Sequence, residues 1–216
     1  MKNINKIYIV VMLLGCLTGC ATPNVPLSDN FWQTPHQKIV VVLTKPATPT
    51  MYKEGPEGLA DIAINDLVDK DFYDYLAKAN MIWYSNLQST FVNKLNKNNM
   101  QAYAYPDYLA DKKHYETVVA ATNSDEILIL NLQVYGAVRN YYGFIPVDKP
   151  KAYCVMNGQL INALTKQVLW NYNLTVNQVV MGNWDQPANY PNFTVSLNNA
   201  STICQEEMLS NFFGYR

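Results

Sequence analysis

Apolar runs and alternating segments along the chain predict most of its strands. The run from Lys38 to Leu43 is rich in β-branched residues, which is typical of a strand covered on both faces. Glu126 to Val138 predicts a long strand that alternates in its second half. Residues 152–163 and 167–179 alternate well and are joined by Leu164-Thr165-Lys166, which predicts a β-hairpin.

Apolar positions recur at helical spacing between these strands. The spacing predicts helices over four stretches: residues 57–79 (one or two helices), 83–95, 114–122 and 197–213. Met100 to Tyr105 alternates as a short strand. Three segments are expected to be irregular: Thr44 to Gly58, which holds three prolines and two glycines, the aromatic Arg139 to Pro150, and residues 181–195.

The resulting order of elements is β-α-β-α-β-β-β-α, and it predicts the fold class. A buried parallel start followed by an antiparallel meander gives a mixed sheet with helices packed on it, which is an α/β (α+β) architecture. The chain shows no internal repeat, and we expect a single domain over residues 38–216.

The first twenty residues predict export and attachment to a lipid. Two lysines precede an apolar run over residues 7–14, which is too short to span a bilayer and is typical of a signal peptide. Leu17-Thr18-Gly19-Cys20 then resembles the lipobox of bacterial lipoproteins. The resemblance implies a signal peptide over residues 1–19, cleavage before Cys20, and acylation of that cysteine, which would anchor the chain stably through several acyl chains.

Further details of the anchor follow from the neighbouring residues. Leu13-Leu14-Gly15-Cys16 is a second match to the lipobox, and we prefer Cys20 because Leu17 can still belong to the apolar region. Residues 20–37 are polar, contain three prolines and are expected to form a tether. Ala21 rather than Asp after the lipidated cysteine implies, by the enterobacterial sorting pattern, the outer membrane, with the domain facing the periplasm.

Composition adds two constraints. The formal net charge is −1 and only 15% of the residues are charged, so the chain carries no electrostatic footprint for nucleic acid. Apart from Cys16 and Cys20, the chain holds Cys154 and Cys204. In an oxidising periplasm these two are a natural disulfide pair, although two buried free thiols fit the sequence equally well.

The sequence offers little catalytic chemistry. Its two histidines, His36 and His114, form no zinc-binding spacing, and motifs of serine hydrolases or glycine-rich phosphate loops are absent from the sequence. The acidic stretch with Asp66, Asp69 and Asp71 lacks the glycine and the terminal Glu of a calcium loop, and we interpret it as a solvated helix face. We expect no catalytic residue, no metal and no cofactor.

Aromatic side chains are the more informative candidates. Tyr141, Tyr142 and Phe144 lie between two predicted strands and cannot all be buried, and Trp184 and Tyr190 lie in the other irregular segment. Exposed aromatic residues commonly anchor protein interfaces, which makes these five residues candidate partner contacts. The alternative is that they cover the open end of the sheet.

Three segments together resemble a group of envelope lipoproteins: Lys38 to Leu43, Ser124 to Gly136, and Leu160 to Trp170. The group includes curli-secretion-channel subunits, polysaccharide-export lipoproteins and the lipoprotein activators of penicillin-binding proteins. Its members share an Asp before an apolar strand and a hairpin of the form Asp-x-x-Thr-Gly-x-x-x-Trp, from which this chain departs at Asn162 and Lys166. The resemblance implies an α/β domain with a scaffolding or assembly role, and it transfers no catalytic residue.

We therefore expect a non-catalytic, outer-membrane-anchored lipoprotein that helps to assemble or regulate an envelope complex for secretion, export or cell-wall synthesis. The alternative is an oligomeric pore or channel subunit with residues 139–150 as a membrane-facing hairpin tip. A periplasmic hydrolase that uses the acidic stretch is a third hypothesis. The expected partners are the membrane, through the lipid, and an envelope protein or further copies of this chain.

Overall fold

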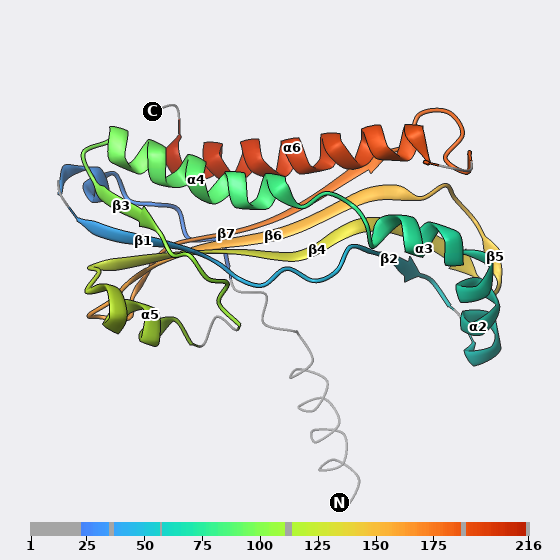
Figure 1. Cartoon of the computed structure of the whole chain (residues 1–216), viewed down its shortest axis with the longest axis horizontal. Coiled ribbons are helices and arrows are strands. Elements are labelled where there is room, and N and C mark those ends of the chain that lie inside the picture. The colour runs from blue at the N-terminus through green and yellow to red at the C-terminus, as the bar shows by residue number, and fades with distance from the viewer. Residues whose placement is uncertain (1–22, 35–36, 57, 111–113, 187–188, 215–216) are drawn as a thin grey trace, which may run out of the picture.

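Strands from both halves of the chain build one mixed β-sheet (Figure 1). The computed structural model describes residues 23–34, 37–56, 58–110, 114–186 and 189–214. The strands are β1 (Lys38–Leu43), β2 (Thr50–Glu54), β3 (Gln101–Ala104), β4 (Glu126–Tyr142), β5 (Ile145–Pro146), β6 (Lys151–Asn162) and β7 (Val168–Val179). The helices are the 3-10 helix η2 (Asp29–Gln33), α2 (Leu59–Val68), α3 (Lys70–Leu76), α4 (Ile82–Lys97), α5 (Tyr115–Thr122) and α6 (Pro191–Phe213).

The sheet combines parallel and antiparallel pairing around β4. Its strand order is β3-β1-β4-β6-β7. β1 pairs in parallel with β3 and β4, whereas β6 pairs antiparallel with β4 and β7. The predicted mixed sheet, with its buried first strand and its antiparallel meander, is confirmed.

β4 is long enough to take two partners along one edge. It pairs with β1 from Glu126 onward and with β2 from Gly136 onward. The second pairing requires glycine, because Gly136 has a φ of +144° and a Cβ there would lie 2.0 Å from the carbonyl oxygen of Thr50. The predicted loop over residues 44–58 is therefore wrong where β2 forms. The prolines of this segment flank the strand rather than interrupt it.

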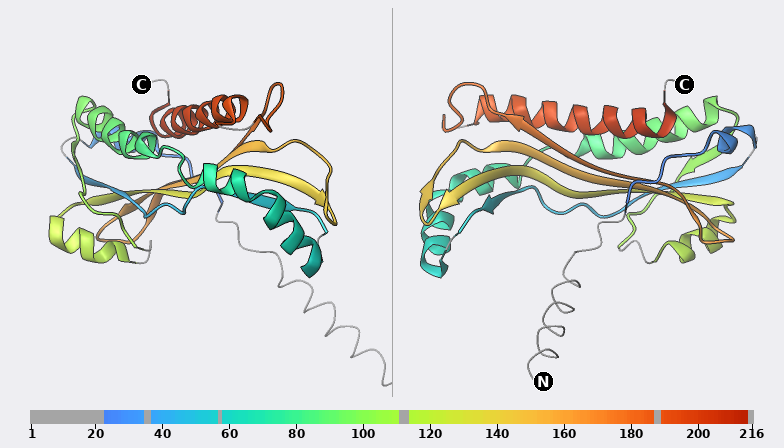
Figure 2. Two further views of the ribbon diagram at one scale, coloured as in Figure 1. Left: turned by 45° about the vertical axis from the view of Figure 1, so that its right-hand side comes forward. Right: turned by 180° about the vertical axis from the view of Figure 1, so that it is seen from behind.

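Helices α4 and α6 lie over one face of the sheet, and α5 lies on the other (Figures 1 and 2). The larger core lies under α4 and α6, where Trp170 of β7 meets the ring of Phe212 at 4.9 Å. A smaller core joins Val118 of α5 to side chains of β1, β4 and β6 such as Val40 and Ile129. Burial on both faces explains the continuous apolar run of β1.

The segment before β1 packs against the domain. Val25 and Asn171 of β7 exchange two backbone hydrogen bonds of 2.8 and 2.9 Å. Phe31 in η2 is buried, and its ring lies edge-on to those of Trp32 and Phe212. The proline-rich composition of residues 20–37 indicated a free tether, but part of this segment is held on the domain. Its aromatic side chains fill space beside the end of α6.

Other elements agree with the sequence in kind and differ at their ends. The pattern over residues 57–79 forms two helices, α2 and α3, which meet at Asp69. α6 begins at Pro191 rather than at residue 197, because proline suits the first turn of a helix. The expected loop over residues 139–150 is partly strand, since β4 continues to Tyr142 and β5 pairs back against it.

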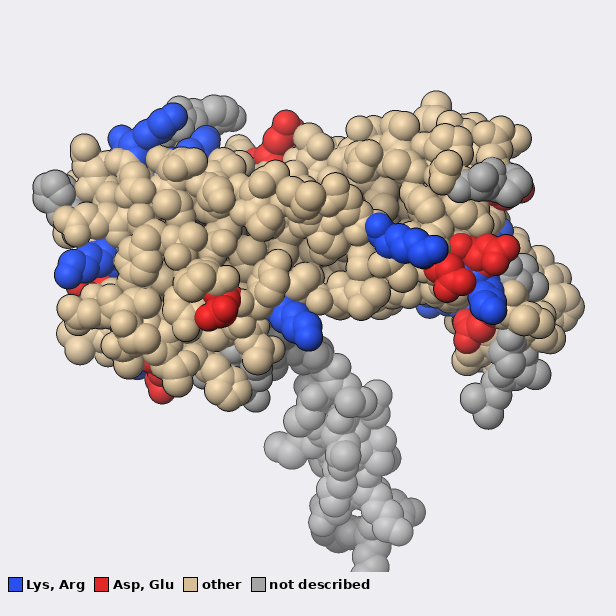
Figure 3. All heavy atoms as spheres, viewed as in Figure 1, with Lys and Arg blue, Asp and Glu red and all other residues tan. Residues whose placement is uncertain are grey.

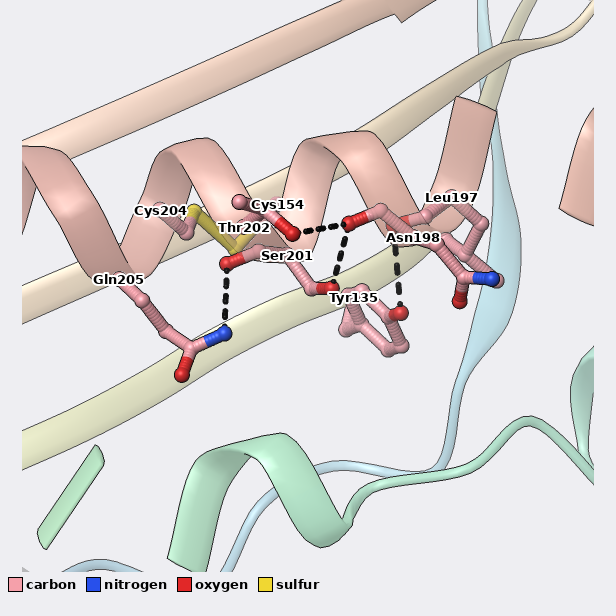
Figure 4. Close-up of a disulfide and its surroundings, with 8 residues drawn as sticks. All are labelled: Tyr135, Cys154, Leu197, Asn198, Ser201, Thr202, Cys204 and Gln205. Carbon is pink, nitrogen blue, oxygen red and sulfur yellow. Dashed lines mark hydrogen bonds between the residues drawn. A yellow bond between two sulfur atoms is a disulfide. The ribbon is translucent and has the colours of Figure 1, made fainter. Parts of the chain in front are cut away.

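A disulfide joins Cys154 of β6 to Cys204 of α6 (Figure 4). The two Cα atoms are 6.7 Å apart, and the residues are separated by 50 positions in the sequence. Beside the disulfide, the Tyr135 hydroxyl of β4 donates a hydrogen bond of 3.4 Å to the carbonyl oxygen of Leu197. Of the two states that the sequence left open for these cysteines, the structure has the bonded one. The disulfide fixes α6 to β6.

Candidate interaction surface

A buried carboxylate fixes the base of the hairpin that follows β4. Asp69 is 4% exposed, accepts a hydrogen bond from the Tyr141 hydroxyl, and lies 3.5 Å (Oδ1 to Nη1) from Arg139. The guanidinium of Arg139 also lies over the rings of Tyr141 and Trp184, at 5.5 and 4.7 Å from their centroids. Burial, and next the hydrogen bond to Asp69, raise the pKa of the Tyr141 hydroxyl well above its ordinary value. The phenol therefore stays protonated and keeps donating to Asp69.

A second carboxylate fixes the return of the hairpin. Asp148 accepts hydrogen bonds from the backbone N and the Nδ2 of Asn140, at 2.9 and 2.6 Å, and pairs with Lys151 at 3.1 Å. Burial acts to raise the pKa of the Asp148 carboxyl, but the bonds from Asn140 and the charge of Lys151 outweigh it and hold that pKa below its ordinary value. Both ends of the hairpin are thus held by side chains of the folded domain.

The tip of this hairpin exposes apolar side chains beside α2. Tyr142 is 70% exposed and Phe144 is 59% exposed. Gly143 joins the tip to the α2 region, because its N–H donates to the carbonyl oxygen of Pro56 and its own carbonyl oxygen accepts from Asn65 Nδ2. We call the exposed apolar residues of the hairpin and of α2 the distal apolar surface: Tyr142, Phe144, Ile145, Val147, Ile62, Ile64 and Leu67.

Charged residues of both signs lie near the distal apolar surface. Lys53 of β2 is largely buried and lies 2.7 Å (Nζ to Oδ1) from Asp66. Asp61 accepts a hydrogen bond from the N–H of Gly58, and Glu54 ends β2. Figure 3 shows charged side chains gathered over α2 and α3, whereas most of the remaining surface in that view is uncharged.

The five aromatic residues predicted as partner contacts divide into two groups. Tyr142 and Phe144 are exposed, but Tyr141 is 3% exposed and supports the hairpin from inside. Trp184 and Tyr190 pack on Phe72 of α3, with ring centroids 5.2 and 5.0 Å apart, so they cover the end of the sheet.

Sequence reasoning missed the contribution of α2 to this surface. Ile64 and Leu67 lie in the acidic stretch, and both side chains are exposed. Apolar residues at helical spacing within that stretch were the available signal. The position of α2 beside the hairpin depends on the contacts of Gly143 with Pro56 and Asn65 and could not be predicted.

The carboxylates of Asp66, Asp69 and Asp71 have different surroundings and do not converge on one site. Asp66 pairs with Lys53, Asp69 faces Arg139 and Tyr141, and Asp71 is exposed. Among the described residues, no three His, Cys, Asp or Glu side chains lie close enough to hold a metal ion.

Neither histidine contributes to the distal apolar surface in the part of the chain that the structure describes. His114 is exposed and immediately precedes α5. His36, the predicted signal peptide and both candidate lipidation sites, Cys16 and Cys20, lie outside the described residues. Of the described helices, none is both long and apolar enough to cross a bilayer.

Comparison with known proteins gives matches to solved structures alone, since no family model and no curated protein matches the sequence. The PelC dodecamer from Paraburkholderia phytofirmans matches with 14% identity over 84% of this chain and 90% of that chain, at a TM-score of 0.34. Lipoprotein GNA1162 from Neisseria meningitidis matches with 12% identity over 66% of this chain and 83% of that chain, at a TM-score of 0.28. The LpoB C-terminal domain from Salmonella enterica matches with 11% identity over 69% of this chain and 91% of that chain, at a TM-score of 0.26.

The lipoprotein group that the sequence resembles is represented among these structures. The likeness concerns the general fold and assigns no function to this chain.

Proposed function

We propose that this chain is a non-catalytic envelope lipoprotein that binds a partner protein through the distal apolar surface and so helps to assemble or regulate an envelope complex. The observation that carries this proposal is the contrast within one hairpin. Its base is held by Asp69 and Asp148, while its tip exposes Tyr142 and Phe144. Large apolar side chains grouped on a surface are typical of interaction sites.

The fixed base favours binding. A hairpin that is already held in place loses little conformational entropy when a partner covers it. Tyr and Phe supply large contact areas with few rotatable bonds. The tip therefore has the properties of an anchor that inserts into an apolar groove.

The charges around the tip favour a protein over a lipid surface. Glu54, Asp61 and Asp66 lie near it, and two lysines of this region, Lys53 and Lys151, are paired with Asp66 and Asp148. Binding to anionic lipid is favoured by basic residues around an apolar patch, which is the opposite arrangement. The complementary partner has an apolar groove flanked by lysine or arginine.

The proposed anchor limits where this partner is found. In this proposal the signal peptide of residues 1–19 is removed, Cys20 is acylated in the outer membrane, and the domain faces the periplasm. The carbonyl oxygen of Pro23 accepts a hydrogen bond of 2.8 Å from Asn171 Nδ2, so only residues 21 and 22 separate the lipid from a point held on the domain. That distance is about 10 Å at full extension. The domain therefore lies close to the membrane, and so does its partner.

Site-specific photo-crosslinking in cells tests the proposal. A photoreactive amino acid at Phe144 should crosslink the chain to one envelope protein. The same residue at Leu164, which is 89% exposed in the β6–β7 turn, is the matched control and should not capture that protein. The double variant Tyr142→Ser and Phe144→Ser should lose the complex while Leu164→Ser keeps it.

Other outcomes of this experiment contradict the proposal. Crosslinks from position 144 to lipid alone would identify a membrane-contacting tip. Crosslinks to a second copy of the chain alone, with a matching oligomer by light scattering, would favour the pore or channel hypothesis. Full function of the double serine variant in cells would show that the distal apolar surface has no role.

A further inference from the structure

A cavity of about 460 Å³ lies at the other end of the sheet, near the β6–β7 turn. One wall is the segment that precedes β1, including Leu27 and Phe31. The opposite wall includes Val168 and Leu169 at the start of β7. The volume falls within the range of small-molecule sites, and much of the lining is apolar.

Two hydrogen-bond acceptors in the cavity lining have no partner among the residues that the structure describes. Glu126 is 1% exposed, and its Oε2 accepts no hydrogen bond. The Oε1 of Gln37 is also buried without a partner. Both residues line the cavity, and its described lining contains no lysine or arginine. Buried acceptors without donors destabilise the folded state and are rare in native proteins. A bound ligand that donates to both acceptors would remove this cost.

The surroundings of Glu126 also disfavour the ionised form of its carboxyl group. Burial, and next the charge of Asp125, raise the pKa of Glu126 from 4.5 to about 7. Near neutral pH the side chain is therefore poised between its neutral and ionised forms. A positive charge beside it would favour the ionised form.

We propose that this cavity binds an ammonium group carried on an alkyl chain. The nitrogen donates to Glu126 and Gln37, and the carbon chain lies against Leu27, Phe31 and Val168. A protonated amine has three donors and one charge, which satisfies both acceptors and compensates the carboxylate. A neutral alcohol satisfies fewer of these groups, and a carboxylate ligand is repelled.

Binding of n-butylamine to the full chain in detergent tests this inference. Methyl NMR shifts of Leu27 and Val168 report on the cavity. At about pH 8.5 we expect saturable binding of butylamine, and binding of n-butanol that is about tenfold to hundredfold weaker, which is the usual effect of losing a charged hydrogen bond. The affinity for butylamine should fall about tenfold per pH unit below about pH 7, because Glu126 must lose its proton.

Two variants separate the charge of Glu126 from the apolar lining. Glu126→Gln keeps the size of the side chain and should weaken butylamine about tenfold or more without changing the affinity for butanol. Asp125→Asn removes the neighbouring exposed charge and should keep affinity for butylamine within about threefold. Circular dichroism checks that both variants are folded.

The inference is overturned if butylamine and butanol bind equally well, or if Glu126→Gln leaves the affinity for butylamine unchanged. A second probe identifies the source of the amine. Binding of the peptide acetyl-Leu-Lys-Leu-amide at least as tightly as butylamine would assign the cavity to a lysine side chain of a protein. Binding of butylamine without the peptide would assign it to a free amine.

Discussion

Replacing Glu126 by glutamine should stabilise the folded chain at neutral and alkaline pH. Glu126 is 1% exposed, its Oε2 has no hydrogen-bond partner in the described part of the chain, and the charge of Asp125 lies nearby. An ionised carboxylate in that position is unfavourable in the folded chain and well solvated in the unfolded one. Glutamine has nearly the same shape and carries no charge.

The pKa of Glu126 gives the sign and the size of this effect. Burial and then the charge of Asp125 raise it from 4.5 to about 7, so the folded chain binds this proton more tightly than the unfolded chain. The stabilisation from the proton is complete below about pH 4.5 and is lost as the pH rises through about 7. The difference between the two limits is about 3 kcal/mol. Glu126→Gln should show no such loss.

Urea unfolding of the wild type and of Glu126→Gln at several pH values measures this difference. Urea is chosen because a guanidinium ion could itself pair with Glu126. The free energy of unfolding of the wild type should fall by up to about 3 kcal/mol relative to the variant between about pH 5 and about pH 8.5. Parallel curves for the two proteins over that range would refute the assignment of Glu126 as a buried, unpaired carboxyl.

Three further predictions concern the contacts that hold the fold together. Cys154→Ala with Cys204→Ala should cost about 4 kcal/mol in urea unfolding, the chain-entropy value for a 50-residue separation; a reductant should lower the stability of the wild type alone, and equal stabilities would exclude the disulfide. Phe31→Ala should cost about 3 kcal/mol and speed hydrogen exchange at the Val25 amide, whereas unchanged exchange would show that Phe31 does not hold this segment. Tyr141→Phe should cost about 1–3 kcal/mol by removing the bond to Asp69, and Tyr142→Phe, at an exposed position, should cost nothing; equal stabilities would refute the role of Asp69.

Local patterns predicted the elements that are buried on defined faces. β1 is apolar after Lys38 because helices lie on both faces of the sheet, and β6 and β7 alternate because their faces differ. The helix patterns were similarly clear where one stripe meets the core, as in α4 with Leu87 and Phe91. In each case, the period of burial is visible in the sequence itself.

Features that depend on contacts between distant residues could not be predicted. β2 has too few residues and too many neighbouring prolines to stand out, and it is a strand because Gly136 lets it approach β4. The burial of Tyr141 depends on Asp69, which is distant in sequence. The cavity beside Glu126 exists because Phe31 docks at the end of α6, and nothing near Glu126 in the sequence signals it.

The segment that closes the cavity is also the connection to the proposed lipid anchor, and this links the two proposals. With residues 23–31 docked, the chain between Cys20 and the domain reaches about 10 Å, whereas release of the segment back to Gln37 would extend this to about 60 Å. A ligand that binds only the closed cavity stabilises the docked segment by mass action. Addition of butylamine should therefore slow hydrogen exchange at the Val25 amide in the wild type and leave it unchanged in Glu126→Gln. Equal slowing in both proteins would show that the docking of this segment is independent of the charge in the cavity.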